Sequence, residues 1–316
     1  MALLLTEDDV AQVLTMPAAV DAVEEALRHL SAGAAENLPR RRLRTPSGAL
    51  HLMAGSAPGL GYLGVKAYTT FAGVARFVVL LYDAHDGRLL ALIQADRLGQ
   101  IRTGAASGVA TRHLALADAA TVGFFGTGWQ ARSQLEAVRT VRSIRLVKAY
   151  GRDRERREAF CREMTALLGI EVRPAERPEE VVEGSRIVVT ATASAQPVFD
   201  GRHLEAGTHV NAMGSNSLLK REVDEVAVLR ADLVVVDSIE QAKLESGDLL
   251  GPIERGQLSW AAIRELDDVV AGRVGRRTRE EITLFESHGL GLEDVAAAAR
   301  TYELARERGF GLQVPL

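Results

Sequence analysis

The fold is decided by the stretch Thr121-Val122-Gly123-Phe124-Phe125-Gly126-Thr127-Gly128-Trp129-Gln130-Ala131. A short apolar run leads directly into the pattern G-x-G-x-x-A, and helical spacing follows as far as Thr140. In a dinucleotide-binding turn the first glycine permits the tight turn, and the second lets backbone N–H groups approach a pyrophosphate. The helix after the turn directs its positive N-terminus at the phosphates. A glycine-rich turn without function is the alternative, but the flanking strand and helix favour nucleotide contacts at Gly126, Thr127, Gly128, Trp129, Gln130 and Ala131.

Strand and helix patterns alternate after this turn. The candidate strands are 121–125, 144–150, 170–172, 187–190, 209–212 and 233–236. This alternation predicts an α/β fold with a Rossmann-type, doubly wound parallel sheet. Before the turn, candidate strands at 49–53, 61–70, 77–82 and 89–93 are joined by short turns, which indicates a largely antiparallel sheet. The length of 316 residues therefore suggests two domains.

Helices are also expected outside the doubly wound sheet. Thr6 is a candidate N-cap for a short helix, and Pro17 is placed to open a second one. A long helix rich in small residues is expected to begin near Thr103, and an amphipathic helix covers residues 292–308. The small residues permit close packing against another element or another subunit.

Composition limits the class of protein. The chain is 47% hydrophobic and 25% charged with a net charge of −4, a balance that does not suit nucleic-acid binding. The apolar run at residues 2–5 is too short for a signal peptide or a membrane span. A single cysteine, Cys161, excludes a disulfide framework and a multi-cysteine metal site, so no metal is expected. We therefore expect a cytoplasmic protein without nucleic-acid or membrane partners.

The choice of cofactor is read at the end of the second strand of the nucleotide domain. An acidic residue there binds the adenosine ribose 2′-hydroxyl in many such folds. This chain has Gly151 followed by Arg152, which leaves room and supplies charge for a 2′-phosphate, so NADP(H) is favoured. NAD(H) stays possible because Asp153 could reach the ribose, and Arg152 could instead cap a solvated turn.

Several spaced motifs resemble the ornithine cyclodeaminase/mu-crystallin family over nearly the whole chain. They are Pro39-Arg40-Arg41-Arg42, His51-Leu52-Met53, Gly64-Val65-Lys66, Ile101-Arg102-Thr103-Gly104-Ala105-Ala106-Ser107, the dinucleotide turn, Asn211-Ala212-Met213-Gly214-Ser215-Asn216, Lys220-Arg221-Glu222-Val223-Asp224, Ser287-His288-Gly289 and Glu293-Asp294-Val295. The resemblance implies a homodimer that handles an amino or imino acid with a nicotinamide cofactor. It also implies a discontinuous α+β domain for substrate and dimerisation, residues 1–117 plus 294–316, around a dinucleotide-binding domain, residues 118–293.

The same resemblance implies the substrate and cofactor contacts. Arg41, Lys66 and Arg102 would surround the substrate: Arg102 would clamp a carboxylate in bidentate fashion, and the titratable amine of Lys66 would act at the imine nitrogen. Only four of the 38 basic residues are lysines, in keeping with a specific use for Lys66. Each of the three could instead serve a structural role, Arg41 on a solvated face. Further cofactor contacts are expected from Thr103, Thr190, Ala191, Thr192, Met213, Gly214, Ser215, Lys220, Ser287 and Gly289.

Two departures from the cyclodeaminase pattern bear on the reaction. Asn216 stands where cyclodeaminases carry an aspartate, and an amide cannot act as a general base. His51 stands where they tend to have a glutamate for the substrate's distal ammonium group; it could donate a proton or simply fill the core. We therefore expect an NAD(P)H-dependent reductase of a small α-imino acid, of the ketimine or pyrroline-2-carboxylate type, with Asn216 beside the reacting nitrogen. The alternatives are an alanine-type dehydrogenase, an ornithine- or lysine-type cyclodeaminase and a non-catalytic NADPH-dependent binder of small ligands.

Overall fold

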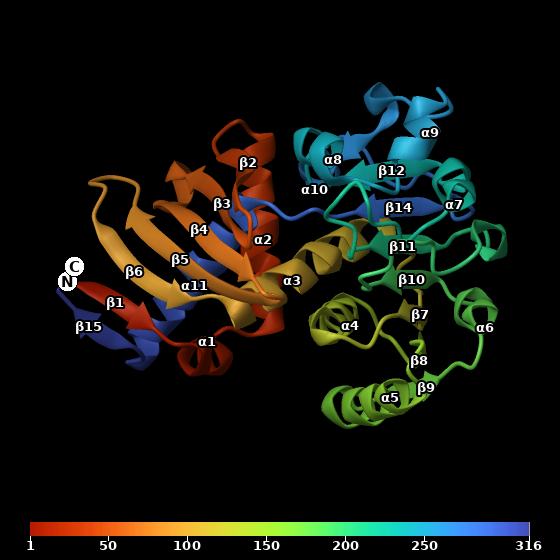
Figure 1. The fold of residues 1–316 in the computed structure, drawn as a ribbon, viewed down its shortest axis with the longest axis horizontal. Coiled ribbons are helices and arrows are strands. Elements are labelled where there is room, and N and C mark those ends of the chain that lie inside the picture. The colour runs from red at the N-terminus through yellow and green to blue at the C-terminus, as the bar shows by residue number, and fades with distance from the viewer. Residues whose placement is uncertain (316) are drawn as a thin grey trace. The chain divides into compact units, whose positions relative to one another are not determined.

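The computed structural model describes residues 1–315, and its contacts divide the chain into two compact units (Figure 1). The first unit comprises Met1–Ala106 and Gly289–Leu316, and the second comprises Ser107–His288. The contacts thus separate the units at 106/107 and 288/289, whereas the sequence suggested limits at 117/118 and 293/294. Among the described residues, no helix is long and apolar enough to cross a membrane.

The second unit contains an eight-stranded sheet in the order β13-β12-β14-β11-β10-β7-β8-β9, and every pair in it is parallel. The strands are β7 (Thr121–Phe125), β8 (Leu146–Tyr150), β9 (Glu171–Pro174), β10 (Ile187–Thr190), β11 (His209–Ala212), β12 (Leu233–Val236), β13 (Arg264–Glu265) and β14 (Thr283–Glu286). The doubly wound sheet is confirmed. The sequence patterns missed β13, which has only two residues, both charged, and β14, although β14 has four residues like the predicted strands β10, β11 and β12. From β7, the chain adds β8 and β9 on one side of the sheet and then β10 and β11 on the other. The strand order therefore reverses between β7 and β10, which is the switch point where such folds bind ligands.

Helices cover both faces of this sheet (Figure 1). They are α4 (Trp129–Val141), α5 (Arg154–Leu168), α6 (Pro178–Val182), α7 (Glu225–Arg230), α8 (Ile239–Glu245), α9 (Leu250–Glu254) and α10 (Leu266–Val270), with short 3-10 turns at Gly201–His203 and Trp260–Ala262. Successive strand residues point to opposite faces, so Phe124 packs into one hydrophobic core and Phe125 into the other. Burial on both sides explains why the strands read as continuous apolar runs.

The first unit contains a seven-stranded sheet in the order β15-β1-β6-β5-β4-β3-β2. The strands are β1 (Ala2–Leu5), β2 (Glu36–Thr45), β3 (Gly48–Ala57), β4 (Tyr62–Phe71), β5 (Val74–Asp83), β6 (Leu89–Gln94) and β15 (Leu312–Val314). The largely antiparallel sheet is confirmed, and only β1 and β6 pair in parallel. The patterns missed β1, β2 and β15; β2 is rich in arginine and lacks a clean alternation of apolar residues.

Three helices belong wholly to the first unit: α1 (Glu7–Val13), α2 (Met16–Ser31) and α11 (Gly291–Arg308), and a 3-10 turn covers Pro58–Leu60. Thr6 caps α1 as expected, its hydroxyl accepting from the Asp9 N–H at 3.3 Å. α11 packs against β3 and β4. The helix and the strand approach closely at Gly55, which has no side chain: a Cβ there would lie 2.5 Å from the Leu292 Cα.

The expected start of the long helix near Thr103 is wrong. Helix α3 runs from Asp96 to Leu114. Its first N–H groups, those of Asp96 and Arg97, donate to the carboxylate of Glu7 at 2.8 Å each. The cap therefore comes from a side chain 89 residues away, which no local capping pattern could reveal. Arg102 lies inside the helix, and the Thr103 hydroxyl donates to the Gly99 carbonyl at 2.7 Å instead of capping the helix.

Candidate active site

The glycine-rich turn of the second unit has the geometry that a dinucleotide needs. Gly126 has φ +113°, and a Cβ there would lie 2.3 Å from the carbonyl oxygen of Ala191. Gly128 is the N-cap of α4, and a Cβ built on it would meet nothing within 4 Å. The turn is thus closed behind Gly126 and open in front of Gly128, where the N-terminus of a 13-residue helix begins. Of the other turn residues, Thr127 and Gln130 are half-buried, Trp129 is exposed and Ala131 is buried against the sheet.

The residues expected to choose the cofactor lie just after β8. A Cβ on Gly151 would come within 3.1 Å of the Thr127 hydroxyl oxygen, so this glycine keeps the space beside the turn clear. The Arg152 side chain is exposed. Asp153 caps α5, its carboxylate accepting from the Arg156 N–H at 3.1 Å, and it also pairs with the Arg156 guanidinium at 3.4 Å. Asp153 thus caps α5, and the cation in direct contact with the turn is Arg132 of α4, which donates to the Gly128 carbonyl at 3.0 Å.

A buried carboxylate that the sequence analysis did not select holds the loops after β10 and β11. Glu222 is fully buried and accepts hydrogen bonds from the Thr190 hydroxyl at 2.9 Å, the Thr192 N–H at 2.5 Å and the Gly214 N–H. Burial raises its pKa above the usual range. Three of the expected cofactor contacts, Thr190, Thr192 and Gly214, donate these hydrogen bonds, so Glu222 fixes their positions.

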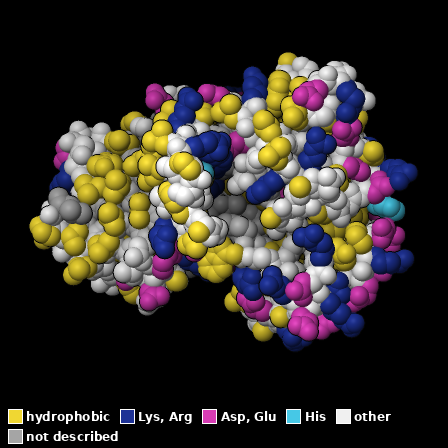
Figure 2. Space-filling view, viewed as in Figure 1, with side chains coloured by type: hydrophobic (Ala, Val, Ile, Leu, Met, Phe, Trp, Pro, Cys, Tyr) yellow, Lys and Arg dark blue, Asp and Glu magenta, His cyan; other side chains and the backbone are white. Residues whose placement is uncertain are grey.

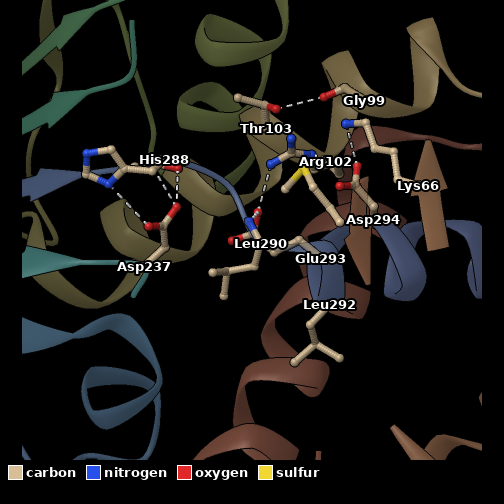
Figure 3. Close-up of polar contacts among 12 residues, drawn as sticks. Lys66, Gly99, Arg102, Thr103, Asp237, His288, Leu290, Leu292, Glu293 and Asp294 are labelled. Carbon is tan, nitrogen blue, oxygen red and sulfur yellow. Dashed lines mark hydrogen bonds and ion pairs between the residues drawn. The ribbon is translucent and has the colours of Figure 1, made fainter. Parts of the chain in front are cut away.

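A second buried group lies at the carboxyl ends of β12 and β14. The His288 imidazole pairs with Glu286 at 3.2 Å and with Asp237 at 3.6 Å, and these carboxylates raise its pKa to about 10 against the opposing effect of burial. Asp237 also accepts from the Ser287 hydroxyl at 2.7 Å (Figure 3 shows His288 and Asp237). Asp248, whose pKa burial and the charge of Glu286 raise to about 8, accepts from the N–H of Glu222 at 2.7 Å. The predicted contact Ser287 is thus fixed by an ionic group.

Asn216 lies in the loop after β11. Its side chain is exposed, and its carbonyl oxygen accepts from the Lys220 ammonium at 3.0 Å. A lysine ammonium only donates, so the amide NH2 of Asn216 is directed away from Lys220. The loop is closed by the Ser215 hydroxyl, which donates to the Lys220 carbonyl at 3.1 Å, and the Met213 sulfur accepts from Ser107 at 2.9 Å. The structure therefore places Asn216, Ser215 and Lys220 in one short, tied loop.

The first unit brings two of the predicted cations together (Figure 3). Lys66 on β4 and Arg102 on α3 are 3% and 6% exposed, and both pair with the same oxygen of Asp294, at 3.0 and 2.9 Å. Arg102 also donates to Glu293 at 3.0 Å. Burial, with Arg102 and Arg40 as further causes, lowers the pKa of Lys66 from 10.5 to about 8 although Asp294 raises it. An amine with such a pKa can give and regain a proton near neutral pH.

The predicted substrate contact Arg41 and its neighbour Arg40 are placed differently. Arg41 is exposed, whereas Arg40 is 7% exposed, its Nε lies 3.4 Å from the Met53 sulfur, and its charge acts on Lys66. The register of β2 on β3 shifts between Leu38 and Arg41, and this bulge changes which residues face inward. Arg40, which the sequence reasoning passed over, is thus the buried arginine of the run.

His51 lies on the same face of the sheet as Lys66. It is 8% exposed, its Nε2 lies 2.9 Å from the Thr70 hydroxyl, and its ring stacks on Tyr68 with centroids 4.2 Å apart. Tyr68 in turn stacks on Phe77, and the Lys66 ammonium lies 5.7 Å from the Tyr68 ring centroid. His51 therefore belongs to an aromatic wall beside the lysine. The last two predicted contacts, Thr103 and Gly289, also lie in this unit, and a Cβ on Gly289 (φ +83°) would meet the Arg102 guanidinium at 2.5 Å.

The sequence analysis did not select the buried acids Glu286 and Asp294, although their sequence neighbours offered a signal. Glu286 ends an apolar run and Asp294 stands among alanines and valine, so their charges occur where burial is expected. A charge buried without a partner is expensive, and such positions call for a counter-ion or a functional group elsewhere in the chain. The sequence does not identify that partner. Across residues 1–315, no group of three or more His, Cys, Asp or Glu side chains is arranged to hold a metal ion.

Comparison with known proteins places this geometry in context. The sequence model of the ornithine cyclodeaminase/mu-crystallin family matches residues 1–309. A Δ1-pyrroline-2-carboxylate reductase of Bacillus cereus is 39% identical over 272 residues, which are 83% of each chain. The Δ1-pyrroline-2-carboxylate reductase of Thermococcus litoralis, in complex with NADH and L-proline, superposes with a TM-score of 0.94 at 36% identity, covering 99% of this chain and 100% of the other. An archaeal alanine dehydrogenase dimer with bound NAD gives 0.92 at 33% identity and covers 99% of each.

Proposed function

The chain belongs to the ornithine cyclodeaminase/mu-crystallin family, and from this premise we propose that it reduces a small cyclic α-imino acid of the pyrroline-2-carboxylate type with a nicotinamide cofactor. The observation that carries the proposal is the buried pair Lys66 and Arg102 in a chain that also contains an open dinucleotide turn. The resemblance to reductases of this substrate extends over most of the chain.

The chemistry of the first unit suits such a substrate. An α-imino acid has one carboxylate, which the planar Arg102 guanidinium can hold in a fixed orientation because Glu293 and Asp294 fix the guanidinium itself. Arg40, rather than the exposed Arg41, supplies a second buried positive charge. Lys66 protonates the imine nitrogen. The stacked rings of His51 and Tyr68 offer an apolar wall to the carbon skeleton.

The turn of the second unit fits a dinucleotide, because Gly128 leaves its front open and α4 directs backbone N–H groups there. When bound, the reduced nicotinamide supplies the hydride. The loops held by Glu222 are the proposed contacts for the rest of the cofactor. Exposed Arg152 beside the small Gly151 favours a 2′-phosphate, so we assign a preference for NADP(H) over NAD(H).

An amino-acid dehydrogenase acting on pyruvate and ammonia is the second candidate, because an archaeal alanine dehydrogenase matches 99% of the chain. The same cations would hold pyruvate. Cyclodeamination ranks lower, because the amide of Asn216 has no basic lone pair with which to take a proton.

We also assign a homodimer. The sheet of the first unit is covered by α11 on the face of Lys66 and Met53. Apolar residues of β3, β4 and β5 alternate onto the other face, where they are only half-buried: Leu50, Leu52, Val65, Ala67, Val78 and Leu80. Figure 2 shows hydrophobic side chains gathered over this sheet. An apolar sheet face of this kind favours association with a second copy.

The test is oxidation of NADPH, and separately of NADH, by the purified protein at neutral pH. Pyrroline-2-carboxylate is supplied in one series, and pyruvate with ammonia in another. Consumption with the cyclic imine alone is the expected result; consumption only with pyruvate and ammonia favours the dehydrogenase. If neither consumes cofactor, the proposed function is refuted.

The cofactor preference is tested with Arg152→Ala. This change should weaken NADPH binding at least tenfold more than NADH binding, since a lost charge-assisted bond is worth about 1.5–3 kcal/mol. Arg162→Ala, on the exposed side of α5, is the matched control and should affect neither. Equal losses for both nucleotides in Arg152→Ala would refute the 2′-phosphate contact.

A further inference from the structure

The first turn of α11 contains two buried acids, Glu293 and Asp294, which are 1% and 0% exposed. Burying a carboxylate is costly unless hydrogen bonds and opposite charge compensate it. Asp294 obtains both from Lys66 and Arg102 through one oxygen, at 3.0 and 2.9 Å (Figure 3). Glu293 pairs with Arg102 at 3.0 Å. Asp294 therefore links Lys66 to Arg102 through one carboxylate oxygen.

The backbone around Asp294 is firmly held. A Cβ on Gly291 would lie 2.5 Å from the backbone of Ala54, so the start of α11 rests directly on β3. The Leu292 N–H donates to the Asn37 side chain at 3.1 Å, which ties the same turn to β2. Lys66 reaches the turn from β4, where it is paired across the sheet with Met53. Asp294 is thus a fixed anion to which the two cations are drawn.

We propose that Asp294 is a positioning residue for the reduction: its carboxylate holds the Lys66 ammonium and the Arg102 guanidinium side by side and keeps Lys66 protonated until the proton is given up. This inference rests on the proposed function. It assigns no proton transfer to Asp294 itself.

The charged groups around Lys66 explain why such an anion is needed. Arg102 on α3 and Arg40 on β2 act against the ammonium, and so does burial. Favourable influences come from Asp294, from the partly buried Asp96 at the start of α3, and from the rings of Tyr68 on β4 and Phe77 on β5. Asp294 is the anion in direct contact, and with it the pKa of Lys66 lies at about 8. Without it, burial and the two arginines would lower the pKa of Lys66 further.

The step is balanced as follows. The imine carbon accepts a hydride from the reduced nicotinamide, and the π electron pair of the C=N bond moves to nitrogen. That nitrogen takes a proton from Lys66 Nζ, whose N–H bond pair stays on the amine. Neutral Lys66 then regains a proton from water, and the product is the amino acid with a new C–H and a new N–H bond.

The kinetic test is the pH dependence of kcat/KM in Asp294→Asn. Because Lys66 must be protonated, activity falls above its pKa, near pH 8 in the wild type. Removal of an opposite charge in direct contact lowers the pKa of a cation by about 1–3 units, so the falling limb should move to lower pH by that amount. Asp294→Glu should restore it. The matched control Glu293→Gln removes an ion pair of Arg102 and should raise KM, but the pH at which kcat/KM falls should stay unchanged.

A direct titration separates this inference from the proposed function. The chain has four lysines, so the 13Cε and 15Nζ resonances of labelled lysine can be followed with pH, and Lys66→Met identifies the signal. The Lys66 signal should titrate near pH 8 in the wild type and lower in Asp294→Asn. Should Asp294→Asn not fold, Arg102→Gln gives the opposite test, because removing that cation should raise the Lys66 titration.

The outcomes are distinct. A Lys66 titration that moves as expected supports the role of Asp294 even if no imine is reduced, in which case the proposed function alone fails. A Lys66 signal that stays in place in Asp294→Asn, or a loss of activity that is equal at every pH, would overturn the inference.

Discussion

Replacing Lys66 by methionine should stabilise the folded protein relative to the wild type, and this stabilisation should be larger at neutral pH than at high pH. Lys66 is 3% exposed, and its pKa falls from 10.5 to about 8 on folding. At ~1.4 kcal/mol per pKa unit, holding the ammonium in this site costs roughly 3 kcal/mol below pH 8. Methionine has a similar length and no charge, and Asp294 keeps its pair with Arg102 at 2.9 Å.

The pH dependence gives the sign. Between about pH 8 and 10.5 the unfolded chain keeps the Lys66 proton and the folded chain has lost it, so the wild type becomes more stable as the pH rises. The variant lacks this gain. Its stability minus that of the wild type should therefore shrink by about 3 kcal/mol between pH 7 and 10.5. Other titrating groups, such as Tyr62 with a pKa raised to about 12 by burial, are common to both proteins and cancel.

The assay is guanidinium chloride unfolding followed by circular dichroism at pH 7, 8.5 and 10. Lys243→Met is the control, because Lys243 is exposed and its removal should give a difference from the wild type that does not change with pH. If the difference between Lys66→Met and the wild type is also constant with pH, the burial of a charged Lys66 is refuted. Loss of imine reduction in the same variant would show that the amine is retained for the reaction at the expense of stability.

Three further predictions concern the cofactor turn, the Asn216 loop and the arginine run. Gly126→Ala should weaken cofactor binding about tenfold or more, measured by NADPH fluorescence, because a side chain at φ +113° lies 2.3 Å from a carbonyl oxygen and such strain costs about 1–3 kcal/mol; unaltered affinity would contradict the strained turn. Lys220→Met should lower kcat, because the Lys220 ammonium orients the Asn216 amide. In a double-mutant cycle, Lys220→Met should cause no further loss of kcat in the Asn216→Ala background, and additive losses would contradict this role. Arg40→Ala should raise KM for the imino acid by about tenfold or more, as expected for a lost charge-assisted contact, while Arg41→Ala leaves KM unchanged; the reverse result would restore Arg41 as the contact.

Long-range capping and strand irregularities account for what the sequence could not predict. The start of α3 depends on a carboxylate 89 residues away, so the local pattern around Thr103 gave a wrong boundary. Arg40 and Arg41 are indistinguishable in a run of arginines, and only the bulge in β2 decides which of them is buried. The partners of Lys66 and Arg102 lie 228 and 191 residues further along the chain.

The sequence by itself determined the doubly wound sheet, the dinucleotide turn and the family, because these depend on local features: apolar runs of strand length, glycines where backbone must turn, and motifs at fixed spacing. The family resemblance also pointed to Lys66 and Arg102 as cations that surround the substrate. Only the tertiary structure decided that Asp294 joins them, that Glu222 fixes the loops after β10 and β11, and that Arg40 faces inward. Buried charges must find counter-ions, but which residue meets them is set by how α11 seats on β3 and β4, and local periodicity contains no record of that contact.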